Sequence, residues 1–317
     1  MKIKNREELI AKQEEYRASL NSQRKQILIC AGTGCVAGGS LEIYAKMKDI
    51  IEGKGLKCAL VLEKDPHGDS IGLKKSGCHG FCEMGPLLRI EPMGWLYIKV
   101  SLDDCEEIIE KSIIGDEVID RLVYKDQEGN PYVKQEDIPF YKQQTRIALE
   151  YCGHINAESI AEYLALGGYS AVAKALFDMT PQGIVDEITE SCLRGRGGGG
   201  FPAGRKWQQG LDQKEEEKYI VCNGDEGDPG AFMDRSMMEG EPHRVIEGML
   251  IAAIATGARH GYIYVRAEYP LAVERLQTAI DKAMDRGLLG KDILGSGFDF
   301  DLHIREPVHL SVVKEVR

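Results

Sequence analysis

The stretch Gln26-Ile-Leu-Ile-Cys30-Ala-Gly-Thr-Gly-Cys35 decides the fold of the first half of the chain. Its short apolar run is typical of a buried strand, and the strand ends in a glycine-bearing loop with a second cysteine. A similar loop follows in Cys78-His-Gly-Phe-Cys82. Four residues separate Cys30 from Cys35, and three separate Cys78 from Cys82. Two such cysteine pairs predict a metal site built from four thiolates.

Hydrophobic periodicity around these cysteines indicates a compact α/β unit. We expect helices over 1–22, over 40–52 and from Asp103 or Asp104 to 113, and strands over 26–30, 59–63, 87–91 and 95–100. The last two strands flank a Pro-Met-Gly turn and are expected to form a hairpin. This order of elements resembles a thioredoxin-like unit.

Two metals suit the four cysteines. Glycine lets the backbone approach a cluster closely and point amide groups at its sulfurs, and an iron–sulfur cluster needs four thiolates. Structural zinc accepts four cysteines at similar spacings, so the spacing alone leaves it open. The placement in a thioredoxin-like unit favours the cluster. His79 is interpreted as a ligand, as a neighbour of the ligands or as an exposed residue.

Composition narrows the class of protein. A chain of 317 residues has room for about two domains. The net charge of −11 argues against nucleic-acid binding, which needs a clustered positive surface. No apolar run reaches the roughly 20 residues of a membrane-spanning helix, and the charged N-terminus lacks the apolar core of a secretory signal. We therefore expect a cytoplasmic protein, without membrane insertion, whose other five cysteines are reduced buried thiols.

The second half predicts a parallel sheet. It follows a polar segment with linker composition, KDQEGNPYVKQEDIP, at 125–139. Helices are expected over 157–166, 170–178, 180–192, 243–256 and 270–286, and strands over 219–222, 262–265 and 300–304. Strands that alternate with helices of this length imply crossover connections and a sheet covered on both faces.

Two loops of the second half carry binding chemistry. Leu193-Arg-Gly-Arg-Gly-Gly-Gly-Gly-Phe-Pro-Ala-Gly-Arg-Lys-Trp207 combines bare backbone, which suits a planar ring or a phosphate, with basic side chains that suit an anionic ligand. Cys222-Asn-Gly-Asp-Glu-Gly-Asp-Pro-Gly-Ala-Phe232 directly follows a strand, where open α/β sheets bind ligands. A flexible loop and a solvated acidic turn are the simpler interpretations. Calcium is disfavoured because the acidic spacing does not fit a helix-flanked calcium loop.

These motifs resemble two known families. The cysteine loops, within residues 25–124, look like the thioredoxin-like [2Fe–2S] ferredoxin domain of the 24 kDa-type subunit of complex I. That domain is also fused to the front of flavoprotein subunits in electron-bifurcating and NAD(P)-reducing hydrogenases. Residues 140–306 resemble the NADH-oxidising 51 kDa-type flavoprotein subunit and its hydrogenase and formate-dehydrogenase relatives.

The resemblance implies a [2Fe–2S] cluster on Cys30, Cys35, Cys78 and Cys82, and an incomplete Rossmann-like FMN/NADH-binding domain. It implies FMN contacts at Gly195, Arg196, Gly197, Gly198 and Lys206, with Asn223, Asp225 and Glu226 also holding the flavin. Phe201 would stack against the NADH adenine. Asp228 falls where the complex I branch has a glutamate near the nicotinamide. That shorter carboxylate, with Gln209 in place of an aromatic residue, points toward the hydrogenase branch and leaves NADH and NADPH both open.

The resemblance ends near the C-terminus. After Asp301-Leu-His-Ile-Arg-Glu306 the family continues with a second nucleotide loop and domains that carry a [4Fe–4S] cluster. Here an atypical tail follows at 307–317, and no cysteine follows Cys222 to supply those ligands. We therefore expect a truncated chain with an uncovered sheet edge and weakened or absent FMN binding. The expected division is a helix at 1–24, the [2Fe–2S] domain at 25–124, the linker at 125–139, the incomplete flavin domain at 140–306 and the tail.

Three functions follow as hypotheses. The first is an NAD(P)H:acceptor oxidoreductase, a flavoprotein subunit of a hydrogenase, formate dehydrogenase or NADH dehydrogenase complex. The flavin would accept a hydride from NADH and pass electrons singly to iron–sulfur clusters, so no side chain is assigned as a catalytic acid or base. The second is a non-catalytic [2Fe–2S] electron-transfer and docking module with an inactive flavin domain. The third is a zinc-stabilised interaction protein.

Overall fold

A computed structural model describes residues 2–64, 70–228 and 230–306. They form two compact units. The cysteine unit comprises residues 14–166 and 236–241, and the parallel-sheet unit comprises residues 2–13, 167–235 and 242–306. The domain boundaries predicted from the sequence remain predictions, and the predicted tail at 307–317 lies outside the described residues.

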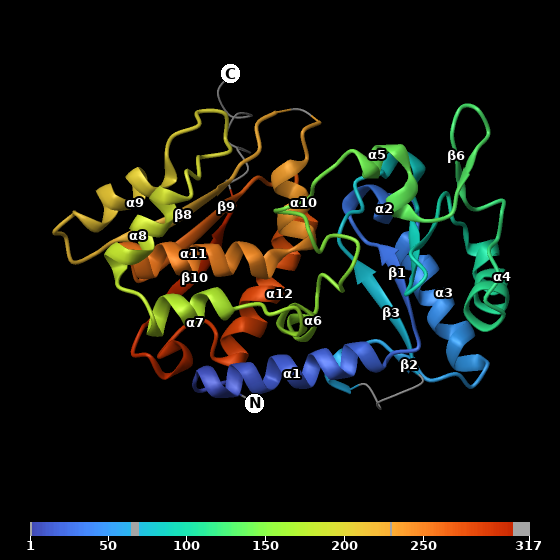
Figure 1. The fold of residues 1–317 in the computed structure, drawn as a ribbon, viewed down its shortest axis with the longest axis horizontal. Helices are drawn as coiled ribbons and strands as arrows, with labels where there is room; N and C mark the ends of the chain where they lie inside the picture. The colour runs from blue at the N-terminus through green and yellow to red at the C-terminus, as the bar shows by residue number, and fades with distance from the viewer. Residues whose placement is uncertain (1, 65–69, 229, 307–317) are drawn as a thin grey trace, which may run out of the picture. The chain divides into compact units, whose positions relative to one another are not determined.

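The cysteine unit contains a five-stranded mixed sheet (Figure 1). Its strand order is β2-β3-β1-β4-β5, with β1 parallel to β3 and antiparallel to β4. The strands are β1 (Lys25–Cys30), β2 (Cys58–Ala59), β3 (Ile71–Ser76), β4 (Leu88–Glu91) and β5 (Trp95–Tyr97). The helices α2 (Thr33–Ala37) and α3 (Ser40–Gly53) lie between β1 and β2 along the chain. This strand–helix–strand unit followed by a hairpin confirms the expected thioredoxin-like fold.

The strand that pairs in parallel with β1 was not predicted. Residues 59–63 were expected to form a strand, but β2 ends at Ala59 and a 3-10 turn follows at Leu62–Lys64. The partner is β3, whose sequence IGLKKS contains two lysines. One of them, Lys74, is buried because Glu162 pairs with it at 3.0 Å, and only tertiary structure reveals such a pair.

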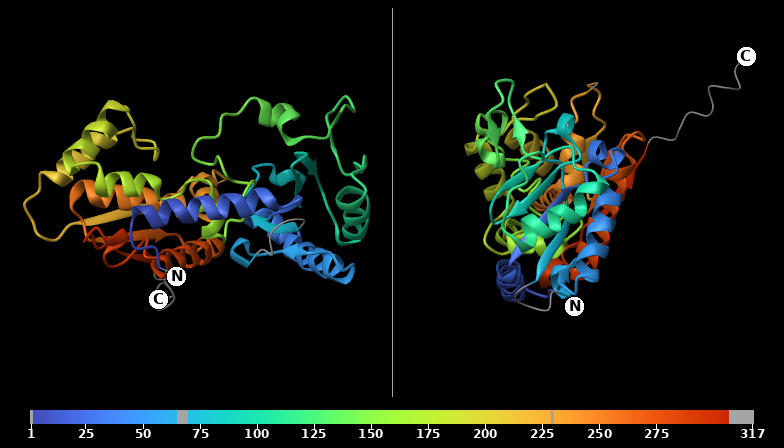
Figure 2. Two further views of the ribbon diagram at one scale, coloured as in Figure 1. Left: turned by 60° about the horizontal axis from the view of Figure 1, so that its bottom comes forward. Right: turned by 90° about the vertical axis from the view of Figure 1, so that its right-hand side faces the viewer.

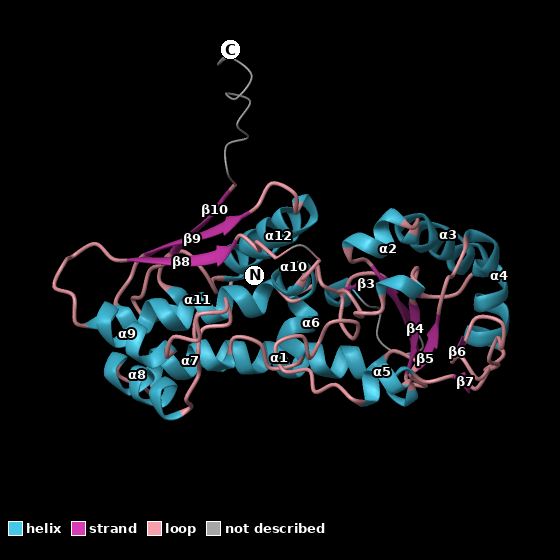
Figure 3. Ribbon diagram, turned by 90° about the horizontal axis from the view of Figure 1, so that it is seen from above, coloured by secondary structure: helices cyan, strands magenta, loops and turns pink. Residues whose placement is uncertain are grey.

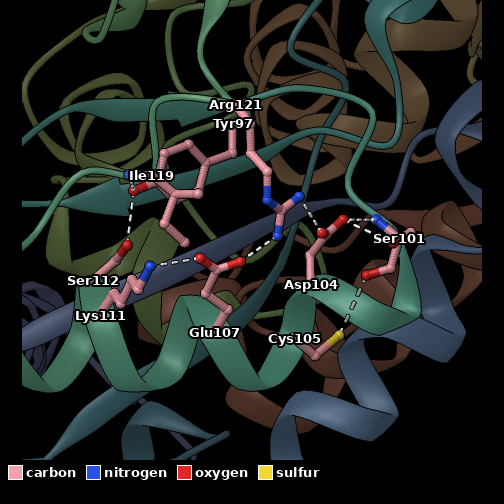
Figure 4. Close-up of polar contacts among 9 residues, drawn as sticks. All are labelled: Tyr97, Ser101, Asp104, Cys105, Glu107, Lys111, Ser112, Ile119 and Arg121. Carbon is pink, nitrogen blue, oxygen red and sulfur yellow. Dashed lines mark hydrogen bonds and ion pairs between the residues drawn. The ribbon is translucent and has the colours of Figure 1, made fainter.

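The predicted C-terminal helix of this fold begins slightly earlier than expected. Ser101 is the N-cap of the preceding 3-10 turn, and its amide donates to Asp104 at 2.8 Å in a capping box. Asp104, one of the two predicted capping residues, is the N-cap of the α-helical part, although its side chain makes no capping hydrogen bond there. The helical run continues through η3 (Leu102–Asp104), α4 (Cys105–Glu107) and the π-helical turn η4 (Ile108–Ile114). Figure 4 shows Arg121 bridging Asp104 and Glu107, while the Tyr97 hydroxyl meets Ser112 at 2.7 Å and so ties this segment to the sheet.

Shorter elements complete the cysteine unit. They are the hairpin β6 (Tyr124–Lys125) and β7 (Pro131–Tyr132), η5 (Gln135–Asp137), α5 (Pro139–Lys142) and α6 (Ile160–Ala165). Two further helices, α1 (Arg6–Ser22) and α10 (Met233–Gly240), have residues in both units. Of the helices in the described ranges, none is long and apolar enough to cross a membrane.

The parallel-sheet unit holds a three-stranded parallel sheet, as predicted. The strands are β8 (Tyr219–Gly224), β9 (His260–Val265) and β10 (Asp301–Arg305), in the order β10-β9-β8. Its helices are α7 (Ser170–Phe177), α8 (Pro181–Glu190), α9 (Ala203–Leu211), α11 (Pro242–Thr256) and α12 (Pro270–Arg286), with η6 at Ile293–Gly295. Helices α9 and α10 were not predicted from the sequence.

Helices α11 and α12 pack on one face of this sheet (Figure 3). Alternate residues of β8 point to the other face, where Tyr219 is 51% and Val221 is 65% exposed. The expectation that both faces are covered is therefore wrong for the part of the chain that the structure describes. The aromatic side chains of this open face, such as Tyr219 and Tyr262, stack across the strands with centroids 6.2 Å apart.

Candidate functional site

The fold brings the four predicted cysteines together. Cys30 ends β1 and Cys35 lies in α2. The loop after β3 carries Cys78, and Cys82 begins the 3-10 turn η2 (Cys82–Met84) that follows it. The parallel register pairs Cys30 with Ser76, which brings the second loop beside the first. The Cys78 and Cys82 sulfurs are 3.5 Å apart, and Cys82 is the exposed member of the set. The first loop differs from expectation because its second half forms the short helix α2.

Glycines allow this convergence of the two cysteine loops. A Cβ on Gly32 would lie 2.9 Å from the Cys78 Cβ, and a Cβ on Gly85 would lie 2.7 Å from the Cys35 sulfur. Both distances are shorter than non-bonded atoms tolerate, so only glycine fits. The Gly80 amide also donates to the Cys78 sulfur at 3.3 Å, the type of contact that tunes iron–sulfur potentials.

Hydrogen bonds among the cysteine thiols shift their pKa values in different directions. The hydrogen bond with Cys35 raises the pKa of Cys30 to about 12 and lowers the pKa of Cys35. The hydrogen bond with Cys30 raises the pKa of Cys78 to about 11. Because metals bind thiolates, these thiols must release protons when a metal is bound.

His79 supports the loop from inside the protein. Its ring is fully buried, with Nε2 2.9 Å from the Ser76 hydroxyl and Nδ1 3.1 Å from the Gln135 side-chain oxygen. Burial lowers the pKa of His79 to about 3, so the ring is neutral at physiological pH. The interpretation of His79 as exposed is wrong, and both ring nitrogens already have partners within the loop's surroundings.

The cysteine pairs suit a two-iron cluster in donor type and grouping. Within the described residues, no three histidine, cysteine, aspartate or glutamate side chains surround a position for a single metal ion. A two-iron cluster has a different requirement, because each iron takes its own pair of protein ligands. Cys30 and Cys35 form one pair and Cys78 and Cys82 the other, and the Cys30 thiol hydrogen-bonds both Cys35 and Cys78. These two pairs fit that donor set.

Two residues that contact the cysteine loops escaped the sequence analysis. Glu239 accepts hydrogen bonds from Thr33 in the first loop, and Arg146 donates to the His79 carbonyl in the second. Neither position carries a local motif. Each lies far along the chain from its partner, so tertiary structure is needed to find it.

The glycine-rich segment of the parallel-sheet unit forms a loop between α8 and α9 (yellow in Figure 2). Its ends are joined by the Gly195 amide, which donates to the Phe201 carbonyl at 2.8 Å, and by an isolated bridge between Arg194 and Pro202. At Gly197 and Gly198, a Cβ would meet no atom within 4 Å. The tip of the loop is therefore open backbone with space beside it.

Lys206 lies in helix α9, which directly follows this loop. Close packing sets its position, because a Cβ on Gly204 would lie 2.7 Å from the Thr189 Cα of α8. Lys206 lines a cavity of about 620 Å³ between α9 and β8, together with Trp207 and Tyr219. Lys206 is the one predicted FMN residue in that lining. Phe201 is 45% exposed beneath the Arg205 guanidinium, and Arg196 is exposed.

The acidic loop begins at the carboxyl end of β8, as expected. Asn223 and Asp225 are exposed, and the Asn223 side-chain oxygen accepts from the Asp225 amide at 3.1 Å. Asp228 is also exposed. Glu226 differs, because its buried carboxylate accepts from the Met233 amide at 2.6 Å at the start of α10.

Other partners complete the contacts of Glu226. Its carboxylate accepts from the amides of Asp234 and Arg235 and, at 3.1 Å, from the Tyr269 hydroxyl. The Glu226 carbonyl accepts from Arg266. The Glu226 side chain therefore stabilises the acidic loop from its buried side, while Asp225 and Asp228 are exposed to solvent.

Comparison with known proteins shows what part of this unit is similar to. Residues 188–313 match the family model of the Nuo51 FMN-binding domain. The α/β chain thus joins a thioredoxin-like unit to a Nuo51 FMN-binding domain region, and the predicted resemblance to 51 kDa-type flavoprotein subunits is confirmed.

The chain is similar to several curated proteins. The chain is 56% identical over 164 residues to the NADP-reducing hydrogenase subunit HndC of Solidesulfovibrio fructosivorans, covering 52% of this chain and 33% of that protein. It is 49% identical over 146 residues to an NADH-quinone oxidoreductase subunit of Aquifex aeolicus, covering 46% and 34%. The chain thus spans about a third of the length of these curated relatives. The crystal structure of the thioredoxin-like [2Fe-2S] ferredoxin from Aquifex aeolicus aligns with 26% identity and a TM-score of 0.26, covering 32% of this chain and 97% of that one.

Proposed function

We propose that the protein is a flavoprotein subunit that oxidises NADH, or reduces NAD(P)+, with FMN and passes single electrons to iron–sulfur clusters. Its partners would be the other subunits of a hydrogenase, formate dehydrogenase or NADH dehydrogenase complex. One observation carries the proposal: a Nuo51 FMN-binding region shares a chain with a unit that gathers four cysteine thiols.

Cys30, Cys35, Cys78 and Cys82 would hold a [2Fe–2S] cluster, which supplies one-electron storage and transfer when bound. The chain contributes the setting. Three of the thiols are buried, which limits access of water, and Cys82 is exposed toward solvent. The Gly80 amide places a hydrogen bond on the Cys78 sulfur.

The open glycine loop would hold FMN through Gly195, Arg196, Gly197 and Gly198, with Lys206 on the adjoining helix. Bound FMN converts the hydride pair of NADH into single electrons. Bare backbone at Gly197 and Gly198 leaves room for a flat ring, and the basic side chains suit the phosphate.

The remaining predicted contacts would orient the two ligands. Asn223 and Asp225 would hydrogen-bond the flavin, Phe201 would stack on adenine, and Asp228 would lie near the nicotinamide. These residues act by position, since hydride transfer requires the two rings at near-contact distance. Glu226 would serve the flavin indirectly, because its carboxylate already binds the start of α10.

A visible spectrum tests the proposal. Full-length protein would be reconstituted anaerobically with iron, sulfide and FMN, then desalted and titrated with NADH. Retained flavin absorption that bleaches with NADH, together with a paramagnetic signal on reduction, is the expected result. Cys78→Ser should abolish the signal, whereas Cys58→Ser, in β2, should keep it. Lys206→Ala should release FMN, whereas Lys214→Ala, in the exposed loop after α9, should not.

The non-catalytic module is the second candidate. It is favoured by the cavity between α9 and β8, whose lining includes only Lys206 among the predicted FMN residues of the described chain. A cluster spectrum without retained flavin would select this candidate. A colourless sample that contains zinc would reject both.

A further inference from the structure

The start of α2 lacks a local cap. Its N-cap is Gly32, which has no side chain to accept from the first free amides of the helix. The usual capping residues are excluded there, because any Cβ would lie 2.9 Å from the Cys78 Cβ. Because the cysteine loops approach so closely, the N-cap position of α2 cannot carry a side chain that would cap the helix.

A carboxylate from α10 supplies the missing acceptor. Glu239 accepts from the Thr33 amide at 3.0 Å and from the Thr33 hydroxyl at 2.5 Å. Its side chain is buried, with the residue 2% exposed, and it belongs to the same compact unit as the cysteine loops. Both oxygens thus bind the residue midway between Cys30 and Cys35.

We propose that Glu239 is a positioning residue for the [2Fe–2S] cluster, which it serves by fixing the first cysteine loop and by lowering the reduction potential. The inference rests on the proposed function, since it needs a cluster on the four cysteines. A buried negative charge beside a cluster opposes the arrival of another electron, because charge interactions are strong where water is excluded.

The second cysteine loop has a tether of opposite charge. The Arg146 guanidinium donates to the His79 carbonyl, between Cys78 and Cys82. Gly80 leaves room for it, since a Cβ there would lie 2.5 Å from the Arg146 Nη2. A positive charge at this loop favours electron uptake, so it should move the potential opposite to Glu239.

Redox titration of the reconstituted full-length chain, followed by electron paramagnetic resonance, tests this pair. Glu239→Gln keeps an acceptor for Thr33 and removes the charge, so the midpoint potential should rise. Arg146→Gln should lower it. Glu241→Gln is the matched control: Glu241 is also buried, but its carboxylate binds the Tyr151 and Cys152 amides instead of a cysteine loop.

The shift in Glu239→Gln should exceed the shift in Glu241→Gln. Equal shifts, or no shift, would overturn the electrostatic role of Glu239. Glu239→Ala removes both acceptors, so it should also retain less iron per chain than Glu241→Gln; equal iron content would overturn the positioning role.

Amide hydrogen exchange in the metal-free protein separates this inference from the proposed function. The segment around Thr33 should exchange faster in Glu239→Ala than in Glu241→Gln, with no cluster required. Unchanged exchange would overturn the tether even if the wild type binds a cluster. A wild-type chain that takes up no cluster would overturn the proposed function and the electrostatic role together, while faster exchange in Glu239→Ala would still support the tether.

Discussion

Replacing Gly32 by alanine measures how closely the two cysteine loops approach each other. The backbone at Gly32 has φ −75° and ψ 156°, which alanine adopts without strain. The added methyl group would lie 2.9 Å from the Cys78 Cβ, so the loops must separate. Its effect is therefore steric, at a point between two predicted cluster ligands.

The cost follows from the size of the overlap. Overpacking a well-packed site costs about 1–3 kcal/mol, and the reduced freedom of the unfolded chain offsets about 0.4–1 kcal/mol. Gly34→Ala is the control in the same loop, since its Cβ would lie 3.6 Å from the Cys82 Cβ, an ordinary contact. Alanine also favours helix α2 there, so we expect Gly34→Ala to match or exceed wild-type stability.

Urea unfolding of the metal-free chain provides the assay. The protein has two tryptophans, Trp95 in β5 and Trp207 in α9. In a Trp207→Phe background, fluorescence reports the cysteine unit alone, which matters because two units need not unfold together. Gly32→Ala should unfold at clearly lower urea than Gly34→Ala. Coincident transitions would refute the close approach of the loops.

Three further outcomes are expected. Lys74→Met leaves the buried Glu162 carboxylate without its cation, so the cysteine unit should lose about 3–5 kcal/mol in urea unfolding, and Lys74→Met with Glu162→Gln should recover most of it. Burial lowers the pKa of His243 to about 3, so folding keeps the ring neutral, while the unfolded chain takes up a proton below about pH 6.5. The stability of the parallel-sheet unit should therefore fall as the pH drops. Between pH 7 and 5 the wild-type unit should lose about 2 kcal/mol more than the same unit in the His243→Asn variant. Gly204→Ala should lower the thermal midpoint of the parallel-sheet unit, because a Cβ at this position would meet the backbone of α8. Gly248→Ala should not lower it, because a Cβ there would meet no atom within 4 Å.

Elements with a strong local signal were predicted closely. The helix expected over 270–286 is α12 (Pro270–Arg286), and the strand expected over 262–265 lies within β9 (His260–Val265). Proline at the first turn and a clean apolar period fix such elements without reference to the rest of the chain. The missed helix α9 follows the glycine loop directly and contains two glycines, which obscured its period.

The candidate site could be predicted where its functional residues lie close together in the sequence. Paired cysteines with glycines between them indicated the metal site, and the structure brings all four thiols together. Glu226 shows the limit of such reasoning. Its place in the acidic loop suggests a ligand contact, yet its carboxylate is turned to the start of α10, and residues seven to nine positions later determine that.

Gly32 shows why the supporting residues of such a site escape sequence analysis. One position cannot both lack a Cβ, as the approach to Cys78 demands, and carry a capping side chain, as the start of α2 demands. The fold resolves this conflict with the carboxylate of Glu239, which lies 206 residues beyond its partner Thr33. The lack of a capping side chain at Gly32 is thus compensated by the hydrogen bonds that Glu239 accepts from Thr33. No local sequence pattern connects these residues. The order of the first cysteine loop should therefore depend on Glu239 as much as on the glycines beside the ligands.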